Sequence, residues 1–245
     1  MQKSGILALA VCLLLAGCGA PSEAPAGSDG TSSEQETVVV PELEETVDYS
    51  WADWDFDRDG AAETVEAVTF REPEGAWASW HQLRISTAAG DLLWSQDAAE
   101  AHIGWTALFA LELDGEDCLL RYNPSMGQGA CTFTYRIFPL DGAGEERVLR
   151  ENRVSFDLNF GSETHEAFDP AAIAAFLEEV HGYLAESTLL LSTDGGTFRT
   201  GGSGADFRES VLGTLWDGAC PYDEEMTLEE NLRNYREFQE RDRNI

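Results

Sequence analysis

The sequence predicts a mainly β protein of the α+β class: an antiparallel β meander, propeller-blade-like in part, followed by two C-terminal helices. Short runs rich in β-branched and aromatic residues, separated by turn residues, fill the stretch 64–160. Hairpin-type turns occur between successive runs, which implies antiparallel pairing. Apolar residues recur at helical spacing only after residue 168.

The first 17 residues have the pattern of a signal peptide. Lys3 precedes ten consecutive apolar residues, Ile6–Leu15, which as a helix would span about 15 Å, half of a bilayer core. The sequence Leu15-Ala16-Gly17-Cys18 resembles the lipobox of bacterial lipoproteins. The resemblance implies cleavage before Cys18, a lipid on its thiol, and a mature protein anchored by that lipid on the extracytoplasmic face of the cell membrane. The alternative is an ordinary secretory signal that contains Cys18.

Residues 18–46 are predicted to form the lipidated cysteine and a disordered acidic tether. They consist largely of Ser, Gly, Ala, Pro and Glu, and such a segment cannot bury enough apolar surface to offset the entropy of ordering it. The remaining residues, 47–245, have the length of a single domain. We expect one β-rich domain whose C-terminal part is helical.

The β meander is predicted to contain eight strands. They are Val65–Phe70, Trp80–Ser86, Asp91–Ser95, Trp105–Leu113, Cys118–Tyr122, Cys131–Pro139, Arg147–Leu149 and Arg153–Phe160. Hairpin-type turns are indicated at Ala89-Gly90, Asp114-Gly115 and Asp141-Gly142. The segment Asn123–Gly129, which contains a proline and two glycines, is predicted to be the least regular connection.

Two helices and one further strand are predicted in the C-terminal third. Asp169 can cap a helix with Pro170 at its first position. The apolar face of this helix would consist of Ile173, Phe176, Leu177, Val180 and Leu184. A short strand, Thr188–Ser192, and a glycine-rich stretch follow, and the capping box Thr227-x-x-Glu230 begins the last helix.

The segment Asp55–Glu66 predicts a metal site. Three aspartates at alternate positions, Asp55, Asp57 and Asp59, precede a glycine. A loop that turns sharply at Gly60 can present these carboxylates, the Ala61 carbonyl and Glu63 to one hard cation such as calcium. The intervening Arg58 would point away. The alternative is a solvated turn that binds calcium too weakly to matter.

Taken alone, the loop also satisfies the twelve-residue EF-hand template, with Glu66 at the closing bidentate position. An EF-hand needs a helix after the loop, but Ala67–Phe70 is strand-like, and Pro73 and Gly75 would stop a helix. Asp55–Phe70 instead resembles the calcium loop and following strand of FG-GAP and VCBS repeats, the blades of extracellular β-propellers. The resemblance implies side-chain ligands at each acid of Asp-x-Asp-x-Asp-Gly-x-x-Glu and a carbonyl ligand at Ala61. Only one copy of the motif occurs, so a full propeller is unsupported.

Residues 48–240 also resemble a domain of uncharacterised lipoproteins from Gram-positive, gut-type bacteria. The resemblance rests on the order of its parts: a DxDxDG loop, a β meander, a helix like Phe168–Ser187, and the strand Leu189–Thr193. Like the lipobox, it implies an exported, lipid-anchored protein.

The charge balance restricts the partners. With 46 acidic and 15 basic residues, the chain has a net charge of −31, which argues against nucleic-acid binding. Metal ions or basic surfaces suit it better. Cys118 and Cys131 lie on predicted neighbouring strands, so a disulfide between them is geometrically open, whereas Cys220 is expected to be a lone thiol.

The function predicted from these features is that of a lipid-anchored, extracytoplasmic binding or structural surface protein with one structural calcium ion. No catalytic motif is present, so we expect no enzymatic activity, and we expect a monomer. Two alternatives are a carbohydrate- or peptide-binding accessory module, with a glycan or protein of the cell surface as its partner, and a hydrolase that uses acidic residues. Candidate ligand contacts are Trp77, Trp80, Arg121, Tyr122 and Asn123.

Overall fold

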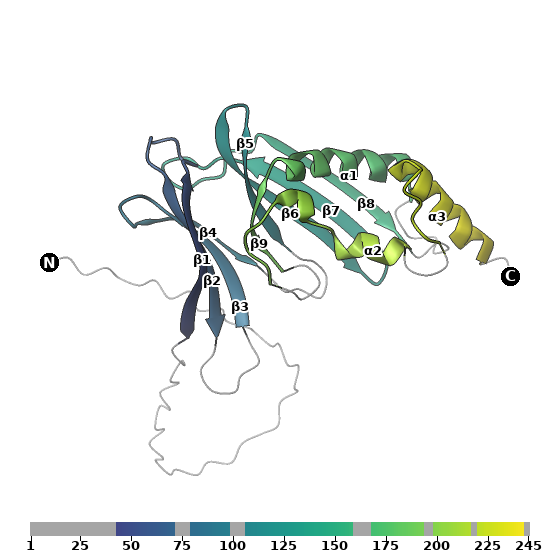
Figure 1. The fold of residues 1–245 in the computed structure, drawn as a ribbon, viewed down its shortest axis with the longest axis horizontal. Helices are drawn as coiled ribbons and strands as arrows, with labels where there is room; N and C mark the ends of the chain where they lie inside the picture. Colours follow the sequence, from purple (N-terminus) through teal and green to yellow (C-terminus); the bar gives the residue numbers. More distant parts are fainter. Residues whose placement is uncertain are drawn as a thin grey trace, which may run out of the picture. The chain divides into compact units, whose positions relative to one another are not determined.

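The computed structural model describes residues 43–71, 79–98, 106–158, 168–193, 198–216 and 220–242 (Figure 1). The predicted class is confirmed, since these residues form two antiparallel sheets, and the helices follow mostly at the C-terminal end. The predictions for the signal peptide, Cys18 and Trp77 lie outside the described residues.

The first sheet is a four-stranded antiparallel meander in the order β1-β2-β3-β4. Its strands are β1 (Glu44–Trp54), β2 (Glu63–Arg71), β3 (Ser79–Ser86) and β4 (Leu92–Ala98). This is the strand order of a single propeller blade.

Strand β1 was not predicted, and it begins at Glu44, inside the segment 18–46 that was predicted to be the tether. Its pairing with β2 shifts register between Val47 and Tyr49 and again between Trp51 and Trp54. Such bulges break the alternation of apolar and polar residues, which is the signal that identifies a strand in a sequence. Acidic residues on an exposed edge strand weaken that signal further.

The second sheet has five strands in the order β8-β7-β6-β5-β9. They are β5 (Ala107–Leu113), β6 (Glu116–Gly127), β7 (Ala130–Phe138), β8 (Arg150–Asp157) and β9 (Thr188–Ser192). The chain returns after its first long helix to add β9 beside β5. The order of the elements in the sequence does not reveal that β9 pairs with β5.

Two predictions within this sheet are wrong. The segment Asn123–Gly129 is not an irregular loop, because β6 continues through Pro124 to Gly127 and the hairpin turns at Gln128 and Gly129, which have φ angles of 54° and 92°. Arg147–Leu149 is not a strand, and β8 begins at Arg150. The bounds of β6 and β8 depend on their hydrogen-bonded pairing with β7. The sequence of either segment alone does not reveal that pairing.

Two hydrophobic cores separate three layers. The first core lies between the two sheets, and the second lies between the second sheet and the helices. Strand β5 contributes to both, since Leu108 and Ala110 face the first sheet while Phe109 and Leu111 face the helices. Strands β5 and β9 are therefore covered on both faces, which explains their nearly continuous apolar runs.

The helices are α1 (Pro170–Ala185), α2 (Ser210–Trp216) and α3 (Leu228–Asp242), with a 3₁₀ turn, η2 (Gly204–Asp206), before α2. Both predicted caps are confirmed: Asp169 accepts hydrogen bonds from two amides of the first turn of α1, and Thr227 and Glu230 form the capping box of α3. Helix α2 and the turn before it were not predicted, since they are too short to show helical periodicity.

Gly144 should not tolerate a side chain. It has a φ of +79°, and a Cβ there would lie 2.0 Å from the backbone oxygen of Leu93 in β4. We expect Gly144→Ala to lower the free energy of unfolding by about 2–4 kcal/mol, measured by urea denaturation. The matched control is Gly142→Ala, where a Cβ meets no atom within 4 Å and the change should stay below about 0.5 kcal/mol. Equal losses in both variants would contradict the close approach.

Candidate metal centre

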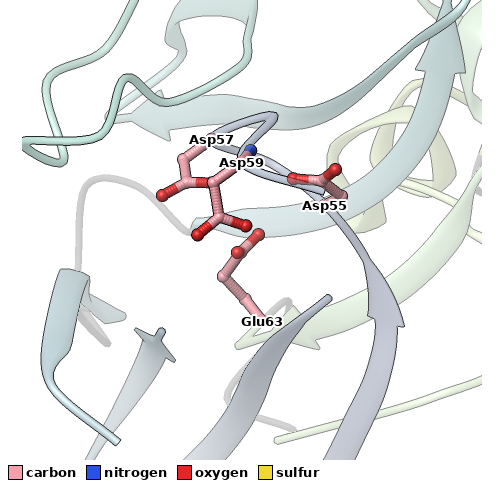
Figure 2. A group of neighbouring side chains, drawn as sticks. All are labelled: Asp55, Asp57, Asp59 and Glu63. Atoms are coloured by element: carbon pink, nitrogen blue, oxygen red, sulfur yellow. The ribbon is translucent and has the colours of Figure 1, made fainter. Parts of the chain in front are cut away.

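Four carboxylates converge in the loop between β1 and β2. One oxygen from each of Asp55, Asp57, Asp59 and Glu63 lies within 4.8 Å of the others. Figure 2 shows the three aspartates around the loop and Glu63 rising toward them from the start of β2. This cluster could hold a metal ion, as the spacing of its acids predicted.

The loop holds its own carboxylates in place through backbone amides. Asp57 Oδ1 accepts the amide of Asp59 at 3.0 Å, and Asp59 Oδ1 accepts the amide of Ala61 at 2.8 Å. The amide of Gly60 reaches back to Asp55 Oδ2 at 3.0 Å. Gly60 makes this turn with a φ of +92°, as predicted, since glycine adopts that angle without strain.

Asp55 has one oxygen that the loop does not use. Its Oδ1 is buried and accepts no hydrogen bond among the described residues. A buried carboxylate oxygen without a donor or a cation is costly, so such atoms in native proteins point to a partner. A bound cation would satisfy this oxygen.

Glu63 is the buried member of the cluster, with 1% of its surface exposed. Burial is the main cause that raises the pKa of its carboxyl, to about 6, and the charges of Asp57, Asp55 and Asp59 add to the rise. The amide of Phe56 donates to Glu63 Oε2 at 2.5 Å and acts in the opposite direction. Glu63 is thus charged at pH 7 only at a cost that a nearby cation would offset.

The acidic loop is fastened to the second sheet. Asp117 Oδ2 at the start of β6 accepts the amide of Asp55 at 2.9 Å, and Glu116 pairs with Arg58 at 2.8 Å. Leu140 donates its amide to the carbonyl of Phe56 at 3.0 Å. Between these contacts the Phe56 ring is fully buried in the core between the sheets. The loop therefore lies at the junction of the two sheets.

Sequence reasoning missed these anchors. Asp117 is 62 residues from Asp55. Only its place two residues after the Asp114-Gly115 turn could have marked it as an acid at the end of a loop. The prediction for Arg58 agrees with the structure, because its guanidinium pairs with Glu116.

Glu66 does not join the cluster, so its predicted ligand role is wrong. It lies three residues after Glu63 on the same strand and pairs across from Arg84 in β3. Successive side chains on a strand point to opposite faces, so Glu66 lies on the face away from Glu63, Val65 and the core. An EF-hand would bring this position back to the ion because a helix follows its loop, and here a strand follows. The carbonyl of Ala61 stays a predicted ligand.

The other candidate contacts do not form one site. Tyr122 is fully buried toward the helices, so it does not share a ligand site with Arg121 and Asn123. Arg121 and Asn123, on the opposite face of β6, line a cavity of about 520 Å³ together with Arg136. Trp80 stacks on Phe70 with ring centroids 4.9 Å apart. Alternation along the strand explains why three consecutive residues are divided between two faces.

The disulfide that the sequence left open does not form. Cys118 and Cys131 are both buried free thiols, and the partly buried Cys220 is a free thiol too. Cys131 pairs across from Met126, eight residues along β6 from Cys118. That separation is about 25 Å along a strand, whereas a disulfide needs Cα atoms less than about 7 Å apart.

Fold and site together define a class: an α+β protein of two packed antiparallel sheets, with an all-carboxylate centre at the junction of the sheets that could hold a metal ion. Comparisons with protein-family models, with curated proteins and with solved structures found no match to this chain. Within the described ranges, no helix has both the length and the apolar character needed to cross a membrane.

Proposed function

We propose that this chain is an exported, lipid-anchored surface protein whose acidic loop binds one structural calcium ion, and that it acts as a binding protein outside the cytoplasmic membrane. The observation that carries the calcium proposal is the convergence of four carboxylates around a buried Asp55 oxygen that accepts no hydrogen bond among the described residues. The proposed role of the protein is binding, not catalysis.

The chemistry of the donors favours calcium over other metals. The cluster consists of carboxylates alone, and oxygen donors suit hard cations, whereas zinc prefers nitrogen and sulfur. Oxygens on opposite sides of a calcium ion lie about 4.6–5.2 Å apart, and around magnesium about 4.0–4.2 Å apart. Separations of up to 4.8 Å between the carboxylate oxygens leave room for the larger ion.

The position of the loop supports a structural role. Phe56 lies between the ligands Asp55 and Asp57 and inserts into the core between the sheets. An ion that holds these aspartates also holds that ring in place. Extracellular calcium modules typically bind at 10⁻⁴–10⁻³ M, a concentration at which the ion is simply present outside cells.

Calcium binding is tested by calorimetric titration at pH 7.5. We expect the parent to bind one calcium ion per chain and Asp57→Ala to lose binding, because the variant removes one side-chain ligand. Asp53→Ala is the matched control, since Asp53 is exposed in β1 and outside the cluster. Undiminished binding by Asp57→Ala, or no binding by the parent at millimolar calcium, would refute the site.

The lipid anchor is tested by fractionation of cells that express the full chain. Cys18→Ser removes the proposed acyl acceptor, so the protein should leave the membrane fraction almost completely. Cys12→Ser changes a cysteine within the apolar run and should leave fractionation unchanged. If the Cys18→Ser protein stays in the membrane fraction, the lipoprotein proposal fails.

A further inference from the structure

Asp55, the first ligand of the proposed calcium site, is held at two points by groups from different parts of the chain. The amide of Gly60, in the same loop, donates to its Oδ2 at 3.0 Å. Its own backbone amide donates to Asp117 Oδ2 at 2.9 Å, and Asp117 lies 62 residues further along, on β6 of the second sheet. The conformation of this ligand therefore depends on a residue of the other sheet.

Asp117 stands on a well-defined part of the second sheet. It follows a hairpin turn in which Asp114 and Gly115 have φ angles of 56° and 81°, the positive values that tight hairpins with twisted strands require. On β6 it pairs across from Glu112 in β5, and the next residue, Cys118, is fully buried. An acceptor whose backbone is fixed in this way can hold its donor in one place.

The neighbouring acid, Glu116, makes a different contact with the loop. Its carboxylate oxygens accept from Arg58 and Arg147, so its charge is compensated by two guanidinium groups. Asp117 pairs with no arginine among the described residues, and the bond that its carboxylate accepts from the loop is the one from the amide of Asp55. A hydrogen bond to a carboxylate is stronger than one between neutral groups, so this contact can fix the main chain at Asp55.

We propose that Asp117 is a positioning residue of the metal centre, and that through it calcium binding is linked to docking of the acidic loop on the second sheet. The role rests on the calcium site proposed above. Fixing the main chain at Asp55 reduces the freedom that the loop must lose when its carboxylates gather around an ion. Because such coupling is reciprocal, a bond that raises the affinity for calcium is itself strengthened by calcium. The ion therefore also strengthens the junction between the two sheets.

Position and charge lead to different expectations at residue 117. Asparagine keeps a side-chain oxygen in the same place and removes the charge, whereas glutamate keeps the charge and moves the oxygen by one methylene group. If Asp117 acts by accepting the amide of Asp55, asparagine should replace it and glutamate should not.

The test is calorimetric titration of calcium into the full chain at pH 7.5. Asp117→Ala and Asp117→Glu should each weaken calcium binding at least about tenfold, the usual effect of losing a group that orients a metal ligand. Asp117→Asn should bind within about threefold of the parent, because a neutral acceptor keeps most of the hydrogen bond. The matched control is Asp114→Asn, which removes one charge from an exposed residue that pairs with Arg150 and should leave the affinity unchanged.

Unfolding experiments separate positioning from a general loss of stability. The cost of Asp117→Ala in the free energy of unfolding is measured by urea denaturation, once with chelator and once with calcium far above both dissociation constants. The cost should be larger with calcium, by about 1.4 kcal/mol for each tenfold loss of affinity. A residue with only a structural role would cost the same in both conditions.

The outcomes distinguish this role from the calcium site itself. If the parent binds calcium and Asp117→Ala binds it equally well, the positioning role is refuted and the calcium site stands. Retained affinity in Asp117→Glu with loss in Asp117→Asn would also overturn the role, because charge and not position would then matter. If Asp117→Ala does not fold, the asparagine and glutamate variants decide the outcome. If the parent binds no calcium, the site is refuted and the positioning role falls with it.

Discussion

Phe56→Ala is expected to lower the free energy of unfolding by about 3–5 kcal/mol, because it removes a fully buried ring from the core between the two sheets. The ring also stacks on Trp54 with centroids 5.9 Å apart. A loss of this size is a large part of the 5–15 kcal/mol that typically separates folded from unfolded domains. Urea denaturation followed by circular dichroism measures it.

The control for this prediction is Leu92→Ala, at a position that is 62% exposed, where the change should stay within about 0.5 kcal/mol. Because Phe56 lies between two proposed ligands, Phe56→Ala should also weaken calcium binding. A loss below about 1 kcal/mol would mean that the two sheets do not depend on this ring.

Calcium at a hundred times its dissociation constant should raise the free energy of unfolding of the parent by about 2.7 kcal/mol. Glu63→Gln should abolish this gain, because the amide keeps the shape of the side chain and removes its charge. In chelator at pH 7.5 the same variant should be at least as stable as the parent, since an ionised Glu63 is held there against a raised pKa. Thermal unfolding with and without calcium measures both effects.

The free energy of unfolding without calcium and the calcium affinity should both depend on pH, in directions set by the raised pKa of Glu63. Without calcium, the raised pKa of Glu63 means that the folded state binds a proton more tightly, so its unfavourable contribution to stability appears as pH rises from about 4.5 to about 6. With calcium, protons compete with the ion, so affinity should fall as pH drops below about 6. Glu112→Gln, an exposed acid in β5, is the control. A calcium gain in Glu63→Gln equal to that of the parent would contradict the assignment.

The parts of the site that could be predicted are those that are local in sequence. Alternating Asp55, Asp57 and Asp59, followed by Gly60, already define a loop that turns back on itself, and the structure confirms the convergence of these aspartates with Glu63. Glu66 was misassigned because the EF-hand template counts positions without the strand that follows. The face on which a strand residue lies depends on its pairing and not on its spacing from the loop.

The buried hydrogen bonds of Glu209 could not be predicted. The Tyr122 hydroxyl reaches Glu209 from 87 positions earlier in the chain and His181 from 28 positions earlier. The short helix that follows Glu209 has no periodicity to mark it. Tyr122 was selected as a candidate ligand contact, whereas the fold buries it and its hydroxyl donates to Glu209.

By itself, the sequence determined the class of the protein, most strand and helix segments, both helix caps and the acidic loop, because these depend on neighbours within about ten residues. Only the tertiary structure decided that β1 completes the first sheet, that β9 lies beside β5, that Asp117 fastens the acidic loop, and that Glu209 is buried beside Tyr122 and His181. The physical reason is that burial and long-range pairing set which face of a strand or helix is used. The sequence around a residue does not identify partners that lie far away in the chain.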